Sequence, residues 1–169
     1  MLSESARMSS AAEARFRIDA PNAKPRRVKV IALDRTSEAV VKRLAALKWN
    51  DATFLTASAF ASEPPERGFS MQGWLSDLAG RTKDLVDEVA GADLVVMVAT
   101  AGEEPPAASL IGEACSLKRV NTTGLILGAP SATDAMLSKT LGRLRPWSLM
   151  LVIASGEDYI ADMLIALRA

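Results

Sequence analysis

From position 28 onward, apolar residues alternate between short continuous runs and stretches with helical spacing. The continuous runs are rich in Val, Ile, Leu and Thr and contain few polar residues, as is typical of strands buried on both faces. They predict strands at 28–33, 52–57, 93–99, 122–128 and 148–154. The stretches between them predict the helices of an α/β fold.

The helical stretches place apolar residues three and four positions apart, which predicts helices with one buried side. Five groups show this spacing: Val40, Val41, Leu44 and Leu47; Met71, Trp74, Leu75, Leu78, Leu85 and Val89; Ile111, Ala114 and Cys115; Met136, Leu137, Leu141 and Leu144; Ile160, Met163, Leu164 and Leu167. Pro105 and Pro106 suit the first turn of the third helix. The segment Ser155-Gly156-Glu157-Asp158 resembles a capping box before the last helix.

Alternating strands and helices predict a Rossmann-like three-layer α/β/α sandwich around a mostly parallel sheet of about five or six strands. A chain of 169 residues is of the usual size for one domain. We therefore expect a single α/β domain over residues 28–169. Residues 1–27, which contain Pro21 and Pro25 near their end, are expected to form a flexible N-terminal arm.

The charge balance and the distribution of apolar residues narrow the class of partner. Twenty basic and twenty acidic residues give a net charge of zero, whereas nucleic-acid-binding domains normally carry a basic surplus. No stretch approaches the ~20 apolar residues of a membrane helix, and the N-terminus does not resemble a secretory signal. We therefore expect a cytoplasmic protein that binds neither nucleic acid nor membranes.

The chain contains no histidine and a single cysteine, Cys115. Catalytic triads that depend on histidine, and metal sites built from histidine or clustered cysteines, are therefore excluded. Cys115 lies among apolar residues of a predicted helix, so we expect a buried packing residue rather than a reactive thiol. The three tryptophans, Trp49, Trp74 and Trp147, are expected in the core or in a subunit contact.

Two predicted strand–turn–helix joints, at 34–38 and 100–106, lie where α/β proteins commonly bind nucleotides. Neither joint contains a glycine-rich phosphate loop, and the first glycine of the chain is Gly68. The first joint has Asp34-Arg35-Thr36 instead, and the second has Glu103-Glu104-Pro105-Pro106. Side chains and prolines at these positions would block the close approach of phosphate oxygens to backbone N–H groups.

Because ligands of such folds bind beyond the carboxyl ends of the strands, polar residues at that rim are the candidate ligand-binding residues. They are Asp34, Arg35, Thr36, Ser37, Thr100, Gly102, Glu103, Ser131, Thr133 and Asp134. Their carboxylates could hold Mg²⁺, a cationic ligand or the hydroxyls of a sugar, and they would repel a bare polyphosphate. The same residue types also cap helix N-termini, which is the simpler interpretation of each residue alone. Catalytic residues cannot be assigned from the sequence.

The order of segments resembles the nucleotide-binding half of the FtsZ/tubulin family over residues 28–130. Three segments show the resemblance. The first strand and its helix are similar to Val28-Lys29-Val30-Ile31-Ala32 and the helix from Ser37, and the next strand to Ala52-Thr53-Phe54-Leu55-Thr56-Ala57. The strand that leads into the family's glycine-rich loop is similar to Gly91-Ala92-Asp93-Leu94-Val95-Val96-Met97-Val98-Ala99-Thr100-Ala101-Gly102. The resemblance implies the fold and a habit of self-association, but not GTP hydrolysis, because both glycine-rich loops are replaced. A second resemblance is to sugar-isomerase (SIS) domains, whose sugar-phosphate turn is similar to Thr100-Ala101-Gly102-Glu103-Glu104-Pro105.

Two functional hypotheses follow from the sequence. The favoured one is a non-hydrolytic relative of nucleotide-binding domains that acts in ligand sensing or protein–protein contact. It is expected to form a homodimer through apolar surface near the N-terminal arm or on a tryptophan-bearing helix. The alternative is a small carboxylate-dependent enzyme, with Mg²⁺ as a possible cofactor, or an SIS-like domain that binds a phosphorylated sugar or metabolite.

Overall fold

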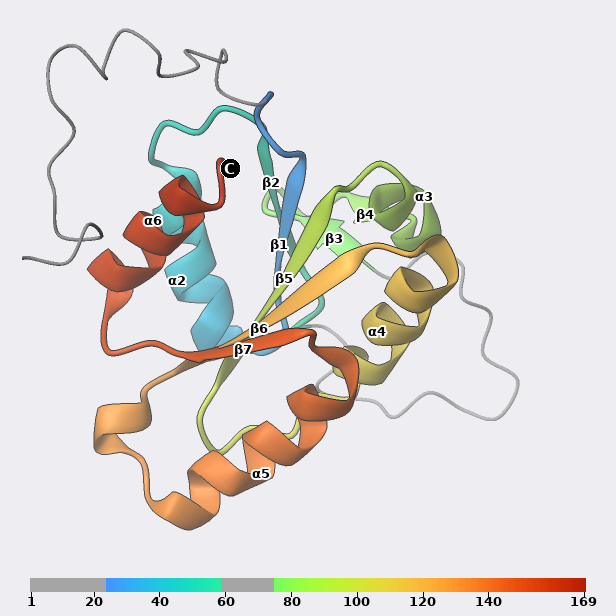
Figure 1. Ribbon diagram of the computed structural model, residues 1–169. Helices are drawn as coiled ribbons and strands as arrows, with labels where there is room; N and C mark the ends of the chain where they lie inside the picture. Colours follow the sequence, from blue (N-terminus) through green and yellow to red (C-terminus); the bar gives the residue numbers. More distant parts are fainter. Residues whose placement is uncertain (1–23, 59–74) are drawn as a thin grey trace, which may run out of the picture.

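The computed structural model describes residues 24–58 and 75–169, which form helices on both faces of a central sheet (Figure 1). Seven strands are arranged in the order β4-β3-β2-β1-β5-β6-β7. The predicted Rossmann-like α/β class is therefore confirmed. Most of the expected N-terminal arm and the predicted helical positions Met71 and Trp74 lie outside the described residues.

The five strands predicted from the sequence form the parallel part of the sheet. They are β1 (Val28–Ala32), β2 (Ala52–Thr56), β5 (Leu94–Thr100), β6 (Asn121–Leu127) and β7 (Met150–Ile153). Their registers are regular, with Val30 of β1 between Phe54 of β2 and Val96 of β5. The central strands are buried on both faces, which explains why their sequences show little alternation.

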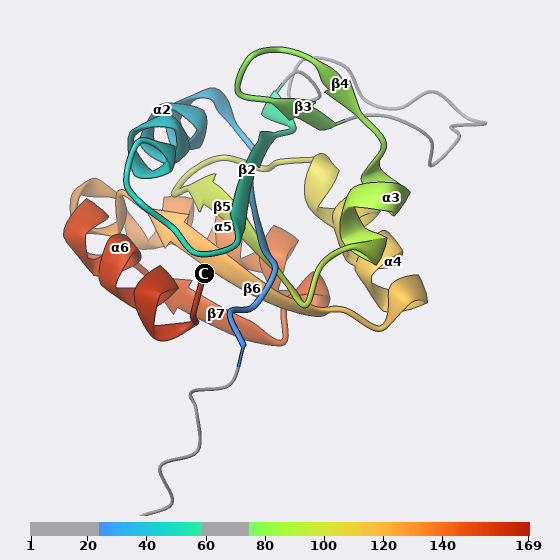
Figure 2. The same ribbon diagram turned by 90° about the horizontal axis from the view of Figure 1, so that it is seen from above.

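Among the described residues, helices cover both faces of the sheet (Figures 1 and 2). The helices α2 (Arg35–Ala45) and α6 (Glu157–Ala166) pack on the face that presents Val30, Val96 and Leu125. The opposite face is covered by α3 (Leu85–Ala90), α4 (Ala107–Lys118) and α5 (Asp134–Leu144). Two short 3-10 turns, η3 (Ala129–Ser131) and η4 (Arg145–Trp147), flank α5. In the described ranges no helix is long and apolar enough to cross a membrane.

The predicted helix that included Leu75 and Leu78 is wrong at these positions. Residues there form the antiparallel strands β3 (Leu75–Asp77) and β4 (Thr82–Lys83), and the helix α3 begins only at Leu85. The turn between the strands contains Gly80 at φ +83°, and the Asp77 carboxylate accepts hydrogen bonds from the N–H groups of Ala79 and Arg81. This turn chemistry outweighs an apolar spacing that happened to match a helix.

Two helix starts also differ from the sequence prediction. Helix α6 begins after Gly156, and no side chain caps it, because glycine rather than the predicted Ser155 occupies the N-cap position. Helix α4 begins at Ala107, so Pro105 and Pro106 precede the helix rather than occupy its first turn. Both differences are shifts of one or two residues, and the predicted helices themselves are present.

Helix α4 approaches the 3-10 turn η4 closely where Gly112 faces Trp147. A Cβ atom on Gly112 would lie 2.5 Å from the Trp147 Cβ and 2.7 Å from its ring. Trp147 is half-buried and packs against the core beneath α4. The absence of a side chain at Gly112 thus allows a large aromatic ring to lie against the helix backbone.

We expect Gly112→Ala to lower the free energy of unfolding by about 1–3 kcal/mol, because the added methyl group overpacks the Trp147 contact. The control is Gly142→Ala in α5, where an added Cβ meets no atom within 4 Å. That control should raise stability by about 0.5–1 kcal/mol through helix propensity. Urea unfolding followed by circular dichroism measures both values. Equal effects of the two substitutions would contradict the close packing of α4 on Trp147.

Candidate functional site

The strand order reverses between β1 and β5 at the centre of the sheet. From β1 the chain passes through α2 to β2 on one side, whereas from β5 it passes through α4 to β6 on the other. The helices α2 and α4 lie on opposite faces, so the two connections diverge at this point (Figure 1). In open α/β sheets this divergence creates the crevice in which ligands bind. The candidate site therefore lies between the carboxyl ends of β1 and β5.

The carboxylate of Asp34 bridges this crevice. Asp34 follows β1, is 3% exposed, and accepts hydrogen bonds on both oxygens. Its Oδ1 accepts from the Ser37 backbone N at 2.8 Å and from the Thr100 Oγ1 at 2.9 Å. Its Oδ2 accepts from the Thr100 backbone N at 2.8 Å. A buried carboxylate needs such donors because charge is costly to remove from water.

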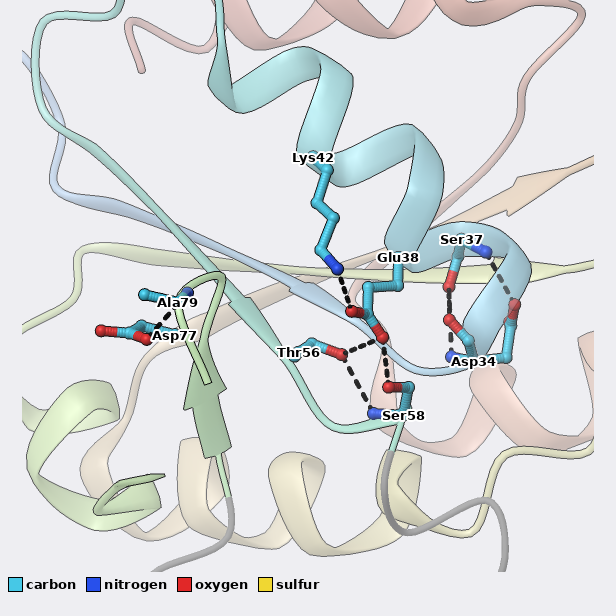
Figure 3. A network of polar contacts seen from close by, with 8 residues as sticks. All are labelled: Asp34, Ser37, Glu38, Lys42, Thr56, Ser58, Asp77 and Ala79. Atoms are coloured by element: carbon cyan, nitrogen blue, oxygen red, sulfur yellow. Dashed lines mark hydrogen bonds and ion pairs between the residues drawn. The ribbon is translucent and has the colours of Figure 1, made fainter. Parts of the chain in front are cut away.

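Asp34 and Ser37 also form a reciprocal cap at the start of α2, visible in Figure 3. The Asp34 N–H donates to the Ser37 Oγ at 3.1 Å, and the buried Ser37 hydroxyl donates to the Asp34 carbonyl at 2.9 Å. In nucleotide-binding folds, N–H groups at this helix end receive a phosphate. Here a side-chain carboxylate of the chain itself takes the Ser37 N–H and the positive end of the helix dipole.

A residue of α5 binds the backbone of the turn after β5. Thr140 is fully buried, and its Oγ1 accepts from the Gly102 N at 2.9 Å and lies 2.7 Å from the Glu103 carbonyl oxygen, to which it donates. Gly102 has φ +99°, and a Cβ there would lie 2.8 Å from the Met136 Cε. The backbone groups of the turn after β5 are therefore directed to α5, and Met136 covers the glycine.

The structure divides the ten sequence-predicted site residues into three groups. Asp34, Ser37, Thr100, Gly102 and Glu103 come together at the switch point, where Glu103 contributes its backbone carbonyl and exposes its side chain. Arg35 and Thr36 lie exposed in the first turn of α2. Ser131, Thr133 and Asp134 lie exposed before and at the start of α5, where Thr133 caps the helix by accepting from the Met136 N.

Sequence reasoning missed Thr140 and Glu38. Thr140 lies inside a predicted helix, and its position beneath the second turn depends on the packing of α5. Glu38 is on α2, and its side chain is 20% exposed. It accepts hydrogen bonds from Thr56, the last residue of β2, and from Ser58 beyond it, and it pairs with Lys42 at 2.6 Å (Figure 3). A Glu four residues before a Lys was the available signal for that pair.

Beside this cluster lies a shallow pocket of about 460 Å³, lined by Arg35, Glu38, Ala39, Lys42 and Ser58. The hydrogen bond from Lys42, followed by that from Ser58, holds the pKa of the Glu38 carboxyl below the ordinary value of 4.5, although burial acts in the opposite direction. Glu38 is therefore ionised near neutral pH. The pocket presents one carboxylate and two cationic side chains, which suits a small polar ligand.

Two other kinds of site, a metal site and a reactive cysteine, can be assessed among the described residues. Among residues 24–58 and 75–169, no three side chains of His, Cys, Asp or Glu lie close enough to hold a metal ion. Cys115 is buried, and burial raises the pKa of its thiol to about 12. A thiol in this environment stays protonated and unreactive at neutral pH.

Comparisons with known proteins give distant matches to solved structures. Translation elongation factor SelB from Methanococcus maripaludis, in complex with the GTP analogue GppNHp, superposes with a TM-score of 0.48 at 11% identity over 85% of this chain and 34% of that one. Its apo form gives a TM-score of 0.44 at 10% identity, over 83% and 33%. The chain thus spans about one third of the length of these structures. No protein-family model and no curated protein matches the sequence.

We expect Asp34→Ala to lower the free energy of unfolding by about 2–4 kcal/mol, because it removes a helix cap and leaves the Thr100 donors without an acceptor. The matched control is Asp84→Ala, which removes the cap of α3, where Asp84 accepts from the N–H groups of Val86 and Asp87. That control should cost about 1 kcal/mol. Chemical denaturation compares the two. Equal losses would show that Asp34 acts as an ordinary cap and does not join β1 to β5.

We expect the stability gained from Glu38 to disappear in acid. A carboxyl whose folded-state pKa is lowered stabilises the protein above its unfolded-state pKa, and this contribution is lost as the pH falls through the lower folded-state value. Glu38→Gln should therefore destabilise the protein at about pH 7, and the difference from wild type should shrink progressively as the pH falls below the ordinary value of 4.5. Urea titrations across this range measure it. Glu113→Gln, on an exposed position of α4, is the control. A gap that does not change with pH would contradict the ionised Glu38 cluster.

Proposed function

We propose that this chain is a non-hydrolytic Rossmann-like domain that diverged from nucleotide-binding proteins and acts through contacts with other proteins. The single observation that supports this most strongly is the Asp34 carboxylate in the switch-point crevice. It uses the Ser37 N–H and both Thr100 donors, which in a nucleotide-binding relative would be free to meet a phosphate. The crevice that normally receives the ligand is bonded internally.

The charges beyond the carboxyl ends of β1 and β5 also favour a role without a nucleotide. Asp34 is buried at the crevice, and Glu103 and Glu104 are exposed on the turn after β5. The two cations near that turn, Lys139 and Arg143, both lie 3.6 Å from the Glu104 carboxylate. A triphosphate would meet these carboxylates, and Lys139 and Arg143 are already engaged by Glu104, so its binding there is electrostatically unfavourable.

Ligand sensing is the second candidate, and the pocket beside α2 supports it. Arg35 and Lys42 are exposed cations among its lining residues, and the Glu38 carboxylate, which pairs with Lys42, also lines it. A small molecule that carries an anionic group and hydroxyl groups would fit this combination. Such binding would use the outer side of α2 and would leave the closed crevice intact.

The finer parts of the proposal rest on sequence reasoning. We propose kinship with the FtsZ/tubulin family from the order of segments over residues 28–130. That kinship would account for a domain that keeps a nucleotide-binding frame and self-associates.

Calorimetric titration of the full chain with GTP, ATP and NAD, each with Mg²⁺, tests the proposal. We expect no saturable heat up to about 1 mM ligand, which corresponds to less than about 4 kcal/mol of binding free energy. Micromolar affinity for GTP together with its turnover would overturn the proposal. Titration with a panel of phosphorylated sugars tests the second candidate, for which Arg35→Ala should abolish any binding found and Arg119→Ala, an exposed arginine after α4, should not.

A further inference from the structure

The two edges of the sheet differ in how they are protected. One edge is β4, which has two residues and carries Lys83, and a short charged strand discourages pairing with another chain. The other edge is β7, with the sequence Met-Leu-Val-Ile. It pairs only with β6 among the described strands and contains no charged residue and no proline. Natural proteins rarely leave such an edge uncovered.

Apolar side chains are exposed along β7 and the helix that follows it. Of the eight large hydrophobic residues exposed among the described residues, five lie in this part of the chain: Leu149, Met150, Ile153, Tyr159 and Ile165. Leu149 is 77% exposed and Ile153 is 47% exposed. Exposed apolar side chains beside an unpaired strand edge mark an interaction surface.

The exposed side chains of β7 are distributed over both faces of the sheet. Val152 packs in the cluster beneath α6, and Leu151 packs in the cluster beneath α5. Because successive residues of a strand face opposite sides, Met150 lies on the α6 side and Ile153 on the α5 side. A helix laid on one face would cover only one of them, whereas an added strand would bring neighbours to both.

Oppositely charged residues flank β7 in the chain. Arg143 and Arg145 precede the strand, and Glu157 and Asp158 follow it at the start of α6. Within residues 24–58 and 75–169, Arg143 pairs with Glu104 and Glu157 pairs with Arg43, whereas Arg145 and Asp158 take part in no ion pair. Each flank of β7 therefore keeps one exposed charge outside these ion pairs, a cation before the strand and an anion after it.

We propose that two copies of this chain associate by antiparallel pairing of their β7 strands about a two-fold axis normal to the sheet. This inference rests on the proposed role in protein contacts and names the partner as a second copy. Antiparallel pairing brings the flank of each strand that carries Arg145 toward the flank of the other that carries Asp158, so the charge match occurs twice. It also satisfies the free backbone groups of both edges and places Met150 and Ile153 against residues of the partner subunit.

The charge pattern selects a second copy over an unrelated peptide. Any extended segment could pair with the backbone of β7, but only a strand with the reverse order of charges would match both ends. The chain itself supplies that strand when it is rotated by a half turn. The surface differs from the N-terminal arm and the tryptophan-bearing helices that the sequence suggested as the dimer contact.

Sedimentation velocity of the full chain at about 50 µM tests the pairing. We expect a dimer for the wild type and a monomer for Ile153→Lys, because a cation at the strand edge opposes strand addition. The control is Leu47→Lys, which makes the same type of change at a residue 53% exposed beyond α2. It should remain dimeric. A monomeric wild type, or a dimer that survives Ile153→Lys, would overturn the proposal.

A charge exchange tests the antiparallel arrangement itself. Arg145→Glu and Asp158→Arg should each weaken dimerisation by about tenfold, since each places like charges together at two symmetric positions. The double variant R145E/D158R should recover most of the loss, and failure to recover would exclude this arrangement. The result is independent of the nucleotide titrations. A wild type that is monomeric and has no nucleotide affinity would overturn only the proposed dimer. A wild type that is dimeric and hydrolyses GTP would overturn only the proposed function.

Discussion

The hydrogen bonds of the Asp34 carboxylate hold together the centre of this structure. They connect the end of β1, the first turn of α2 and the end of β5, which are the three elements that meet where the strand order reverses. The site is buried, so each donor left without an acceptor would be costly. The carboxylate therefore stabilises the junction and at the same time takes up donors that a ligand at this switch point could otherwise use.

Thr140 performs the corresponding task on the other side of the junction. It binds the turn after β5 to α5, and Met136 covers Gly102 in the same turn. With both turns bonded internally, the polar groups that could still meet a partner lie farther out, around Glu38 and Lys42 on α2. The Rossmann-like frame thus keeps its switch point, while polar groups at that point serve the stability of the sheet.

The two edges of the sheet differ in what they offer to a partner. The edge at β4 is short and charged, whereas the edge at β7 is apolar and ends in opposite charges. A domain whose switch-point donors are taken up by its own side chains can still act through such an edge, because strand addition needs only free backbone groups and matching side chains. A contact of this kind supports a binding role better than a catalytic one.

The sequence by itself determined the fold class, the five parallel strands and the helices between them, because burial on one or both faces imposes local periodicities that can be counted. It also excluded histidine chemistry and identified Asp34, Ser37 and Thr100 as neighbours of a possible site. It failed at β3 and β4, where the turn at Asp77 and Gly80 overrode a helix-like spacing. Only the tertiary structure decided that Asp34 bonds to Thr100, 66 positions away, and that Thr140 lies beneath Gly102. Contacts between distant residues depend on how helices pack on the sheet, and no local pattern in the chain records them.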